Sequence, residues 1–359
     1  MKKIGLKVTT VALTLGLAAA GISPASADGP LAGGGASFQA DFQTKCLARF
    51  NTAGASVNKG ISVSYASSSS GGGRTALAGA NNASTVRFAG SDSIGKTGNL
   101  TEDNSIWFPV AAAPLAIIVN LRATNDSKIS SIRLDAETIE RIFTGTITRW
   151  DHSAIKALNP TLRLPDQAIA VVTRSTASGS TGNFKTYLKA NVNSSSLVSG
   201  NQENTGFVNT VTAATSTDLV AAVAAATGRI GYADLSDVTS VVTKVSVKNK
   251  AGQFVLPTAT AATNYVKASG VLTLQGPNAN TKNGGTYTVD FTKSVNNAYQ
   301  ITFITYMVGR NDLNNTDLKV YANYVLNKCT VNPASIGAGG YVSIGSALIA
   351  NAKLQVAKL

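Results

Sequence analysis

Residues 169–181 have the sequence IAVVTRSTASGST, which joins a short apolar segment to a turn rich in serine and glycine. The apolar part, Ile169–Thr173, is rich in β-branched residues, as expected of a buried strand. The turn extends from Arg174 to Thr181, and a helix is predicted over Asn183–Ala190. A strand followed by a turn and a helix indicates an α/β fold when it recurs along the chain.

Two other segments have the same arrangement. Gly33–Phe38 (GGGASF) precedes a helix predicted over Gln39–Phe50 with Ser37 as its N-cap, and Ser67–Gly73 (SSSSGGG) follows a predicted strand at Ile61–Tyr65. The first turn of a helix offers free backbone N–H groups, which bind oxyanions well, and glycine lets the backbone approach a ligand closely. Each turn alone is most often a simple cap. Three in one chain, the last carrying an arginine, favour an anion site.

Asp92 closes the segment Phe88–Asp92 (FAGSD) and is out of place in an anion site, because a carboxylate repels an anion. In its ionised form a carboxylate only accepts hydrogen bonds. It would therefore accept the proton of a protonated oxyanion and reject an oxyanion without one. Phosphate retains a proton near neutral pH and sulfate does not, so Asp92 would favour phosphate.

Helical and strand-like segments alternate along the rest of the chain. Residues 238–300 alternate apolar and polar positions between Gly and Asn turns, which predicts β-hairpins. The other predicted helices are Ala136–Phe143 with Asp135 as N-cap, Leu219–Ala226, Leu318–Leu326 and Val342–Val356, and the other predicted strands are Val110–Val119 and Ile230–Tyr232.

The chain has 359 residues, enough for two domains, and a net charge of +13. Its first 27 residues are predicted to be a signal peptide: lysines precede the apolar stretch Val8–Gly21, and Ala25–Ala27 is a small-residue cleavage site. Removing the three lysines of this segment leaves +10 on the mature chain. No cysteine follows the cleavage site, so we expect no lipid anchor. A basic exported protein favours an anionic partner.

The sequence also excludes several kinds of chemistry. The only histidine, His152, is predicted in a polar surface turn, and the two cysteines are too few for a four-cysteine metal site. Phe184 stands where a nucleotide-binding phosphate loop requires its second glycine. The chain lacks a dense basic run, so nucleic acid is not an expected partner. We predict no metal site, no catalytic residue and no cofactor.

With these motifs the sequence resembles the periplasmic phosphate-binding proteins of phosphate ABC transporters, the PstS family. The most specific stretches are Ile142–Asp151 (IFTGTITRWD) and Ala157–Pro160 (ALNP). The resemblance implies an α/β, two-lobe periplasmic-binding-protein fold of type II, in which each lobe is a mixed β-sheet flanked by helices and the anion lies in the interlobe cleft. By this resemblance residues 28–110 plus 299–359 form lobe I and residues 111–298 form lobe II.

The resemblance also implies a function. The chain would be a monomeric, non-enzymatic protein of the periplasm or the exterior that captures inorganic phosphate and delivers it to the membrane permease of an ABC transporter. One departure from the family is Thr176, where an acid often holds the arginine. The ligand set carried over from the family is Ser37, Phe38, Ser70, Asp92, Arg174, Ser178, Gly179 and Ser180.

The sequence leaves several alternatives open. Cys46 and Cys329 would lie in the same lobe, where they form either a disulfide or two buried thiols. The ligand could be another protonated oxyanion, such as arsenate or a phosphonate. The chain could instead be a secreted surface-associated protein on the same scaffold, or a secreted phosphatase, although it lacks the residues that such an enzyme needs.

Overall fold

The computed structural model of the chain describes residues 31–277 and 282–359. The predicted signal peptide, residues 1–27, lies outside the described residues. The strands are β1 (Leu31–Ala36), β2 (Val63–Ser68), β3 (Val86–Ser91), β4 (Ser105–Asn120), β5 (Ile132–Leu134), β6 (Ala170–Arg174), β7 (Val211–Ala213), β8 (Arg229–Asp234), β9 (Thr243–Lys248), β10 (Phe254–Val255), β11 (Leu272–Gln275), β12 (Thr286–Val289) and β13 (Thr302–Arg310).

Helices flank these strands. They are α1 (Ala40–Asn51), α2 (Ala55–Asn58), α3 (Ser70–Ala78), α4 (Ala136–Phe143), α5 (Ser153–Leu158), α6 (Gly179–Asn191), α7 (Ser216–Ala224), α8 (Ala259–Val266), α9 (Thr316–Tyr324) and α10 (Ser346–Val356), with 3-10 turns at Ser37–Gln39, Leu235–Asp237 and Pro333–Ile336 and a π turn at Val325–Cys329.

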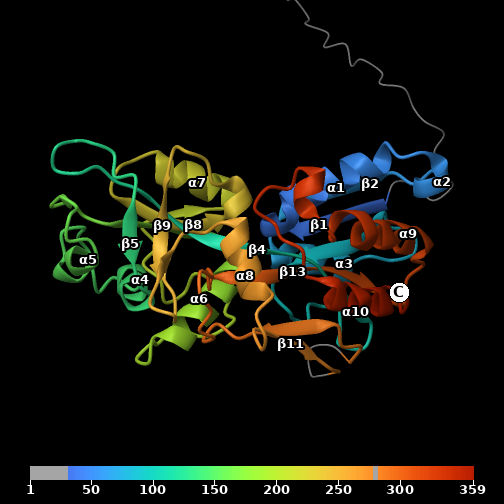
Figure 1. The fold of residues 1–359 in the computed structure, drawn as a ribbon. Coiled ribbons are helices and arrows are strands. Elements are labelled where there is room, and N and C mark those ends of the chain that lie inside the picture. The colour runs from blue at the N-terminus through green and yellow to red at the C-terminus, as the bar shows by residue number, and fades with distance from the viewer. Residues whose placement is uncertain (1–30, 278–281) are drawn as a thin grey trace, which may run out of the picture.

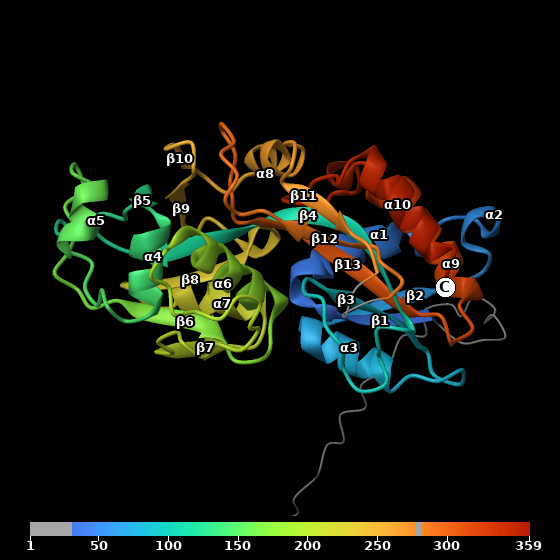
Figure 2. The same ribbon diagram turned by 90° about the horizontal axis from the view of Figure 1, so that it is seen from below.

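The long strand β4 joins two halves of the molecule (Figures 1 and 2). Its first part, Ser105–Pro114, pairs antiparallel with β13, and its second part, Leu115–Asn120, pairs antiparallel with β8. The sheet order β2-β1-β3-β13-β4-β8-β6-β7 therefore runs through both halves. One half contains strands β1, β2, β3 and β13, and helices α1, α3, α9 and α10 lie beside them (Figure 1). The other half contains β6, β7 and β8, and helices α4 to α7 lie beside these strands. This mixed α/β architecture agrees with the predicted fold class.

Most predicted elements are present, with shifted ends. The helix Ala136–Phe143 is found with the predicted bounds, and Asp135 caps it by accepting a 2.9 Å hydrogen bond from the N–H of Thr138. Two predictions are wrong. Ser37 is not an N-cap, because a 3-10 turn begins there and no side-chain cap bond is formed. The region 238–300 contains helix α8 besides its antiparallel strand pairs, since Thr258 caps that helix at the N–H of Ala261.

His152 follows a turn at Trp150 and Asp151, in agreement with the prediction. The residue is partly buried and forms the N-cap of helix α5, where its Nδ1 accepts a 3.1 Å hydrogen bond from the N–H of Ala154. Histidine is not among the preferred N-cap residues, so this helix of only six residues could not be predicted from a cap signal.

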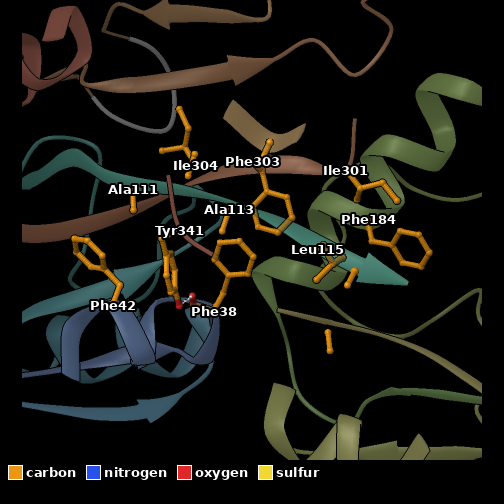
Figure 3. Packing of buried hydrophobic residues seen from close by; sticks show 14 of the residues in the cluster. Phe38, Phe42, Ala111, Ala113, Leu115, Phe184, Ile301, Phe303, Ile304 and Tyr341 are labelled. Carbon is orange, nitrogen blue, oxygen red and sulfur yellow. Dashed lines mark hydrogen bonds between the residues drawn. The ribbon is translucent and has the colours of Figure 1, made fainter. Parts of the chain in front are cut away.

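Aromatic rings fill the core beneath the 3-10 turn at Ser37–Gln39 (Figure 3). The ring of Phe38 stacks on Phe303 at 4.5 Å between centroids and meets Tyr341 edge-on at 6.3 Å, and Phe42 contacts Tyr341 from the next turn. Phe38 is fully buried, and burying such a side chain contributes about 1.5–3 kcal/mol. This packing fixes the backbone of the turn that carries Ser37.

Cys46 and Cys329 form a disulfide, with their Cα atoms 5.9 Å apart. The bond ties helix α1 to the π turn after α9 across 283 residues of sequence, and both cysteines are fully buried. Of the two alternatives left open by the sequence, the structure has the disulfide.

Replacing both cysteines by alanine is expected to lower the free energy of unfolding by roughly 2–5 kcal/mol, because the crosslink restricts the unfolded chain. Urea unfolding of the double variant and the oxidised wild-type protein would measure the difference. Wild-type protein unfolded with a reductant is the control and should match the variant. Equal midpoints for the oxidised wild type and the variant would contradict a stabilising disulfide.

Candidate anion-binding site

Three helical N-termini converge where the two halves of the molecule meet. Ser37 begins a 3-10 turn, Ser70 is the first residue of α3, and Gly179 is the first residue of α6. A Cβ atom on Gly179 would lie 2.5 Å from Ser70 Oγ and 2.8 Å from Asp92 Cβ. Only glycine permits this approach between α6 and α3. The convergence directs the partial positive ends of two helices toward one point.

The guanidinium of Arg174 lies at this point and is almost fully buried. Its Nη1 donates to the hydroxyl oxygens of Ser37 at 3.1 Å and Ser178 at 3.2 Å. Its Nε and Nη2 donate to the carbonyl of Ala214 at 3.0 and 2.6 Å, and Nη2 also reaches the Ser68 carbonyl at 3.4 Å. Ser37 and Ser178 come from opposite halves of the molecule, so Arg174 connects them.

The departure from the family at Thr176 has a structural counterpart. Thr176 is exposed, and neutral carbonyl oxygens hold the guanidinium in place of an acid. None of the ion pairs within residues 31–277 and 282–359 includes Arg174. The charge of Arg174 is therefore not cancelled by a contacting carboxylate and remains available to an anion.

The carboxyl group of Asp92 is buried on the same site, next to Ser70. Asp92 Oδ1 accepts a 2.6 Å bond from the Thr305 hydroxyl, and Oδ2 accepts a 3.2 Å bond from the Ser70 hydroxyl. Burial raises the pKa of Asp92 to about 6, while the Thr305 and Ser70 bonds and the nearby Arg174 and Arg74 act to lower it. Each oxygen keeps a lone pair for a proton offered by a ligand.

The remaining predicted residues lie around this group in different ways. The hydroxyl of Ser180, in the first turn of α6, donates to Asp234 Oδ1 at 3.2 Å. Phe38 directs its ring into the core, and its carbonyl accepts a bond from the Tyr341 hydroxyl (Figure 3). The side chain of Phe38 therefore points away from the site, and only its backbone is available to a ligand. The structure thus brings Ser37, Ser70, Asp92, Arg174, Ser178, Gly179 and Ser180 together at one junction.

Sequence reasoning missed the residues that fix Asp92. Thr305 on β13 receives a 2.8 Å bond from the amide of Gln39, so its own hydroxyl proton is directed to Asp92. From the other half, Asn183 on α6 donates to the Asp92 carbonyl at 2.6 Å. Thr305 lies 213 residues from Asp92, so no local motif could have joined them.

A second buried arginine, Arg74 on α3, was also missed. Its Nη1 donates to Ser91 Oγ at 2.8 Å and to the Ser93 carbonyl at 3.0 Å, and its Nη2 reaches Gln202 Oε1 at 3.3 Å in the other half. Burial lowers the pKa of Arg74 to about 10, and Asp92 acts to raise it. The positive charge of Arg74 therefore stabilises the ionised form of Asp92.

A cavity of about 250 Å³ is lined in part by Asp92. It lies between the second turn of α6, with Gly182 and Asn183, and the strands β12 and β13. The bond from Asn183 to the Asp92 carbonyl stands at its edge. The cavity therefore offers space beside the site at the border between the two halves.

Residues 31–277 and 282–359 hold neither a cluster of metal ligands nor a membrane-spanning helix. No group of three or more His, Cys, Asp or Glu side chains is placed there to hold a metal ion. Within the same residues, no helix is long and apolar enough to cross a membrane.

Comparison with known proteins identifies the family. Residues 21–328 match the PBP superfamily domain. Over 82 residues the chain is 45% identical to the phosphate-binding protein PstS 3 of Mycobacterium tuberculosis, a match that covers 23% of this chain and 21% of that protein. Over 230 residues it is 30% identical to the phosphate-binding protein PstS of Xylella fastidiosa, covering 64% of this chain and 60% of that protein. The chain thus spans about a fifth of the length of the first relative and 60% of the second.

Solved structures show the same fold. A high-affinity periplasmic phosphate-binding protein, solved with phosphate bound, superposes with a TM-score of 0.67 at 22% sequence identity, covering 90% of this chain and 93% of that one. This confirms the two-lobe fold class. The chain belongs to the PBP superfamily, and its curated PstS relatives confirm the resemblance to the PstS family that the motifs indicated.

Proposed function

We propose that this chain is a solute-binding protein that captures inorganic phosphate and delivers it to the permease of an ABC transporter. The proposal is based on the presence of a buried carboxyl, Asp92, and a buried guanidinium, Arg174, in one site at converging helix N-termini, without an ion pair among the described residues that includes Arg174. A cation and N–H groups favour an anion, and a carboxylate accepts a proton. An anion that carries both charge and a proton matches this set, and hydrogen phosphate has both.

Each predicted ligand then has a role in the proposed complex. Arg174 and the hydroxyls of Ser37 and Ser178 would donate hydrogen bonds, since these two hydroxyls only accept from Arg174 in the structure. The hydroxyls of Ser70 and Ser180 would turn their single protons from Asp92 and Asp234 toward the anion. The backbone N–H groups of Phe38 and Gly179 would donate as well, since the first turn of a helix leaves them without intrahelical acceptors. A buried dianion needs such a full set of partners, because an unpaired buried charge is very costly.

The lobe division remains a proposal: residues 28–110 plus 299–359 as lobe I and residues 111–298 as lobe II, closing on the anion by a hinge. The change of partner along β4, from β13 at Pro114 to β8 at Leu115, supports a crossing close to the expected boundary. Strand β12 and the segment after it contact both proposed lobes. The N–H of Tyr287 donates to the hydroxyl of Tyr306 on β13, and the ring of Phe291 contacts the ring of Tyr187 on α6.

We further propose that the chain works as a monomer without catalysis, in the periplasm or outside the cell. The charged groups of the site already form hydrogen bonds within the protein: Asp92 accepts from the Thr305 hydroxyl, and Arg174 donates to the Ala214 carbonyl. A hydrolase would need an activated nucleophile or a metal site. A phosphatase assay with added divalent metals tests this part, and turnover of a phosphate ester would contradict it.

The main test is the heat of phosphate binding to protein that has been stripped of ligand by unfolding and refolding. We expect phosphate to bind with micromolar or tighter affinity, about −8 kcal/mol, and sulfate to give no signal at neutral pH. Arsenate and a phosphonate serve as comparison ligands. If neither phosphate nor a comparison ligand binds, the proposed function is wrong. The alternative of a surface-associated protein would then be favoured.

A further inference from the structure

A second carboxyl group, Asp234, is buried beside the predicted ligands. It ends strand β8, and its side chain is 1% exposed. Its Oδ1 accepts the 3.2 Å bond from the Ser180 hydroxyl, while its Oδ2 has no hydrogen-bond partner among the described residues. Its backbone N–H donates to Ser216 Oγ at 2.8 Å. Burying a carboxylate with one oxygen that has no hydrogen-bond donor is strongly unfavourable, whereas burying the neutral acid is far less so.

The charges around Asp234 also disfavour its ionised form. Asp237, from the 3-10 turn after β8, and Asp92, from the end of β3, are both negative neighbours. Arg174 at the end of β6 is the opposing charge, but no ion pair in the described ranges includes Asp234. The other titratable groups facing it are the hydroxyls of Tyr232 and Tyr341.

Burial raises the pKa of Asp234 well above its ordinary value, and Asp237 and Asp92 raise it further, while Arg174 and the Ser216 side chain act to lower it. An anion bound next to Ser180 would add one more negative charge nearby. Together with Asp237 and Asp92, a bound anion would therefore favour the protonated form of Asp234.

We propose that Asp234 is a positioning residue that acts as a neutral carboxylic acid: it donates its proton to the Ser180 oxygen, and the Ser180 hydroxyl proton is thereby directed to the bound anion. An ionised Asp234 would do the opposite, since it accepts the Ser180 proton and leaves Ser180 with only lone pairs toward the anion. This inference rests on the proposed anion-binding function and adds a proton requirement to it.

The pH dependence of anion binding follows from the proton on Asp234. Because the occupied site holds Asp234 in its protonated form, anion binding is favoured below the raised pKa of Asp234. Binding weakens as the pH rises through that value, by about tenfold per pH unit for one linked proton. A variant that cannot ionise at residue 234 would not show this loss.

The test uses Asp234→Asn, whose amide nitrogen donates to Ser180 as the acid would and does not titrate. Asp126→Asn is the matched control, because that carboxylate is 87% exposed in a side-chain ion pair with Arg122. Two quantities are measured on the refolded full chain with inorganic phosphate: the dissociation constant from mildly acidic to mildly alkaline pH, and the infrared carbonyl band of a protonated carboxyl group.

We expect Asp234→Asn to bind phosphate about as tightly as the wild type at neutral pH and to lack one protonated-carboxyl band that the wild type and the control show. As pH rises, loss of that band and loss of wild-type affinity should coincide. Absence of the band from the phosphate-loaded wild type would overturn the inference. So would a change of tenfold or more, in either direction, in the neutral-pH affinity of Asp234→Asn.

Asp234→Leu separates neutrality from proton donation, since leucine is neutral and of similar size but donates no hydrogen bond. We expect it to weaken phosphate binding by about tenfold or more, and unchanged affinity would count against a donated proton. If the wild-type protein binds no phosphate at all, the proposed function fails. The infrared band still reports the state of Asp234 in that case.

Discussion

Replacing Arg174 by alanine is expected to weaken phosphate binding at least about thirtyfold, which corresponds to about 2 kcal/mol. The guanidinium is buried and donates to hydroxyls of both halves, Ser37 at 3.1 Å and Ser178 at 3.2 Å. Its removal takes away the buried positive charge closest to these predicted ligands. It also leaves the Ala214 carbonyl without the donors that now satisfy it.

Two further variants distinguish a binding role from a structural one. Arg174→Lys keeps the charge but cannot reach Ala214 and the serine hydroxyls together, because lysine lacks the planar fork of arginine. Its loss of affinity should therefore be smaller than that of alanine. Arg122→Ala removes an arginine whose side chain is 53% exposed and should leave binding unchanged. Calorimetric titration measures all three, and an alanine variant with wild-type affinity would remove Arg174 from the site.

The local parts of the site could be predicted from the sequence because each is encoded within a few residues. The strand ending near Arg174 and the Ser-Gly turn that opens α6 are adjacent in the chain. The same holds for Ser69 and Ser70 at the start of α3, where Ser69 caps the helix by accepting from Gly72. Apolar periodicity and turn residues carry this information directly.

Other parts could not be predicted, because they depend on contacts between distant segments. Asp92 is held by Thr305, and Ser180 by Asp234. The two partners are 213 and 54 residues away in the sequence, so no local motif links them. Ser37 was expected to cap a helix, and in the structure its hydroxyl accepts from Arg174 instead. A serine at a helix start is compatible with both roles, and only the tertiary fold decides between them.

Replacing Asp92 by asparagine is expected to reduce discrimination against sulfate far more than it reduces phosphate binding. The carboxylate oxygens already accept from Thr305 and Ser70, so toward a ligand they offer only further lone pairs. Sulfate brings no proton, and like charges placed together cost several kcal/mol. Asparagine removes the charge and can donate through its NH₂ group, so selectivity should fall by on the order of a hundredfold.

The pH dependence of wild-type selectivity provides an independent check on the same residue. Burial raises the pKa of Asp92 to about 6. Above that value the ionised carboxylate rejects sulfate, and as the pH falls through it the protonated acid can donate to sulfate, so sulfate binding should appear. The asparagine variant does not titrate and should bind sulfate on both sides of that pH. Competition titrations of phosphate and sulfate, with Asp126→Asn as the exposed control, measure both effects. If the Asp92→Asn variant kept wild-type selectivity at every pH, the site would not sense the ligand proton through this carboxyl, and recognition would depend on Arg174 and the helix N-termini alone.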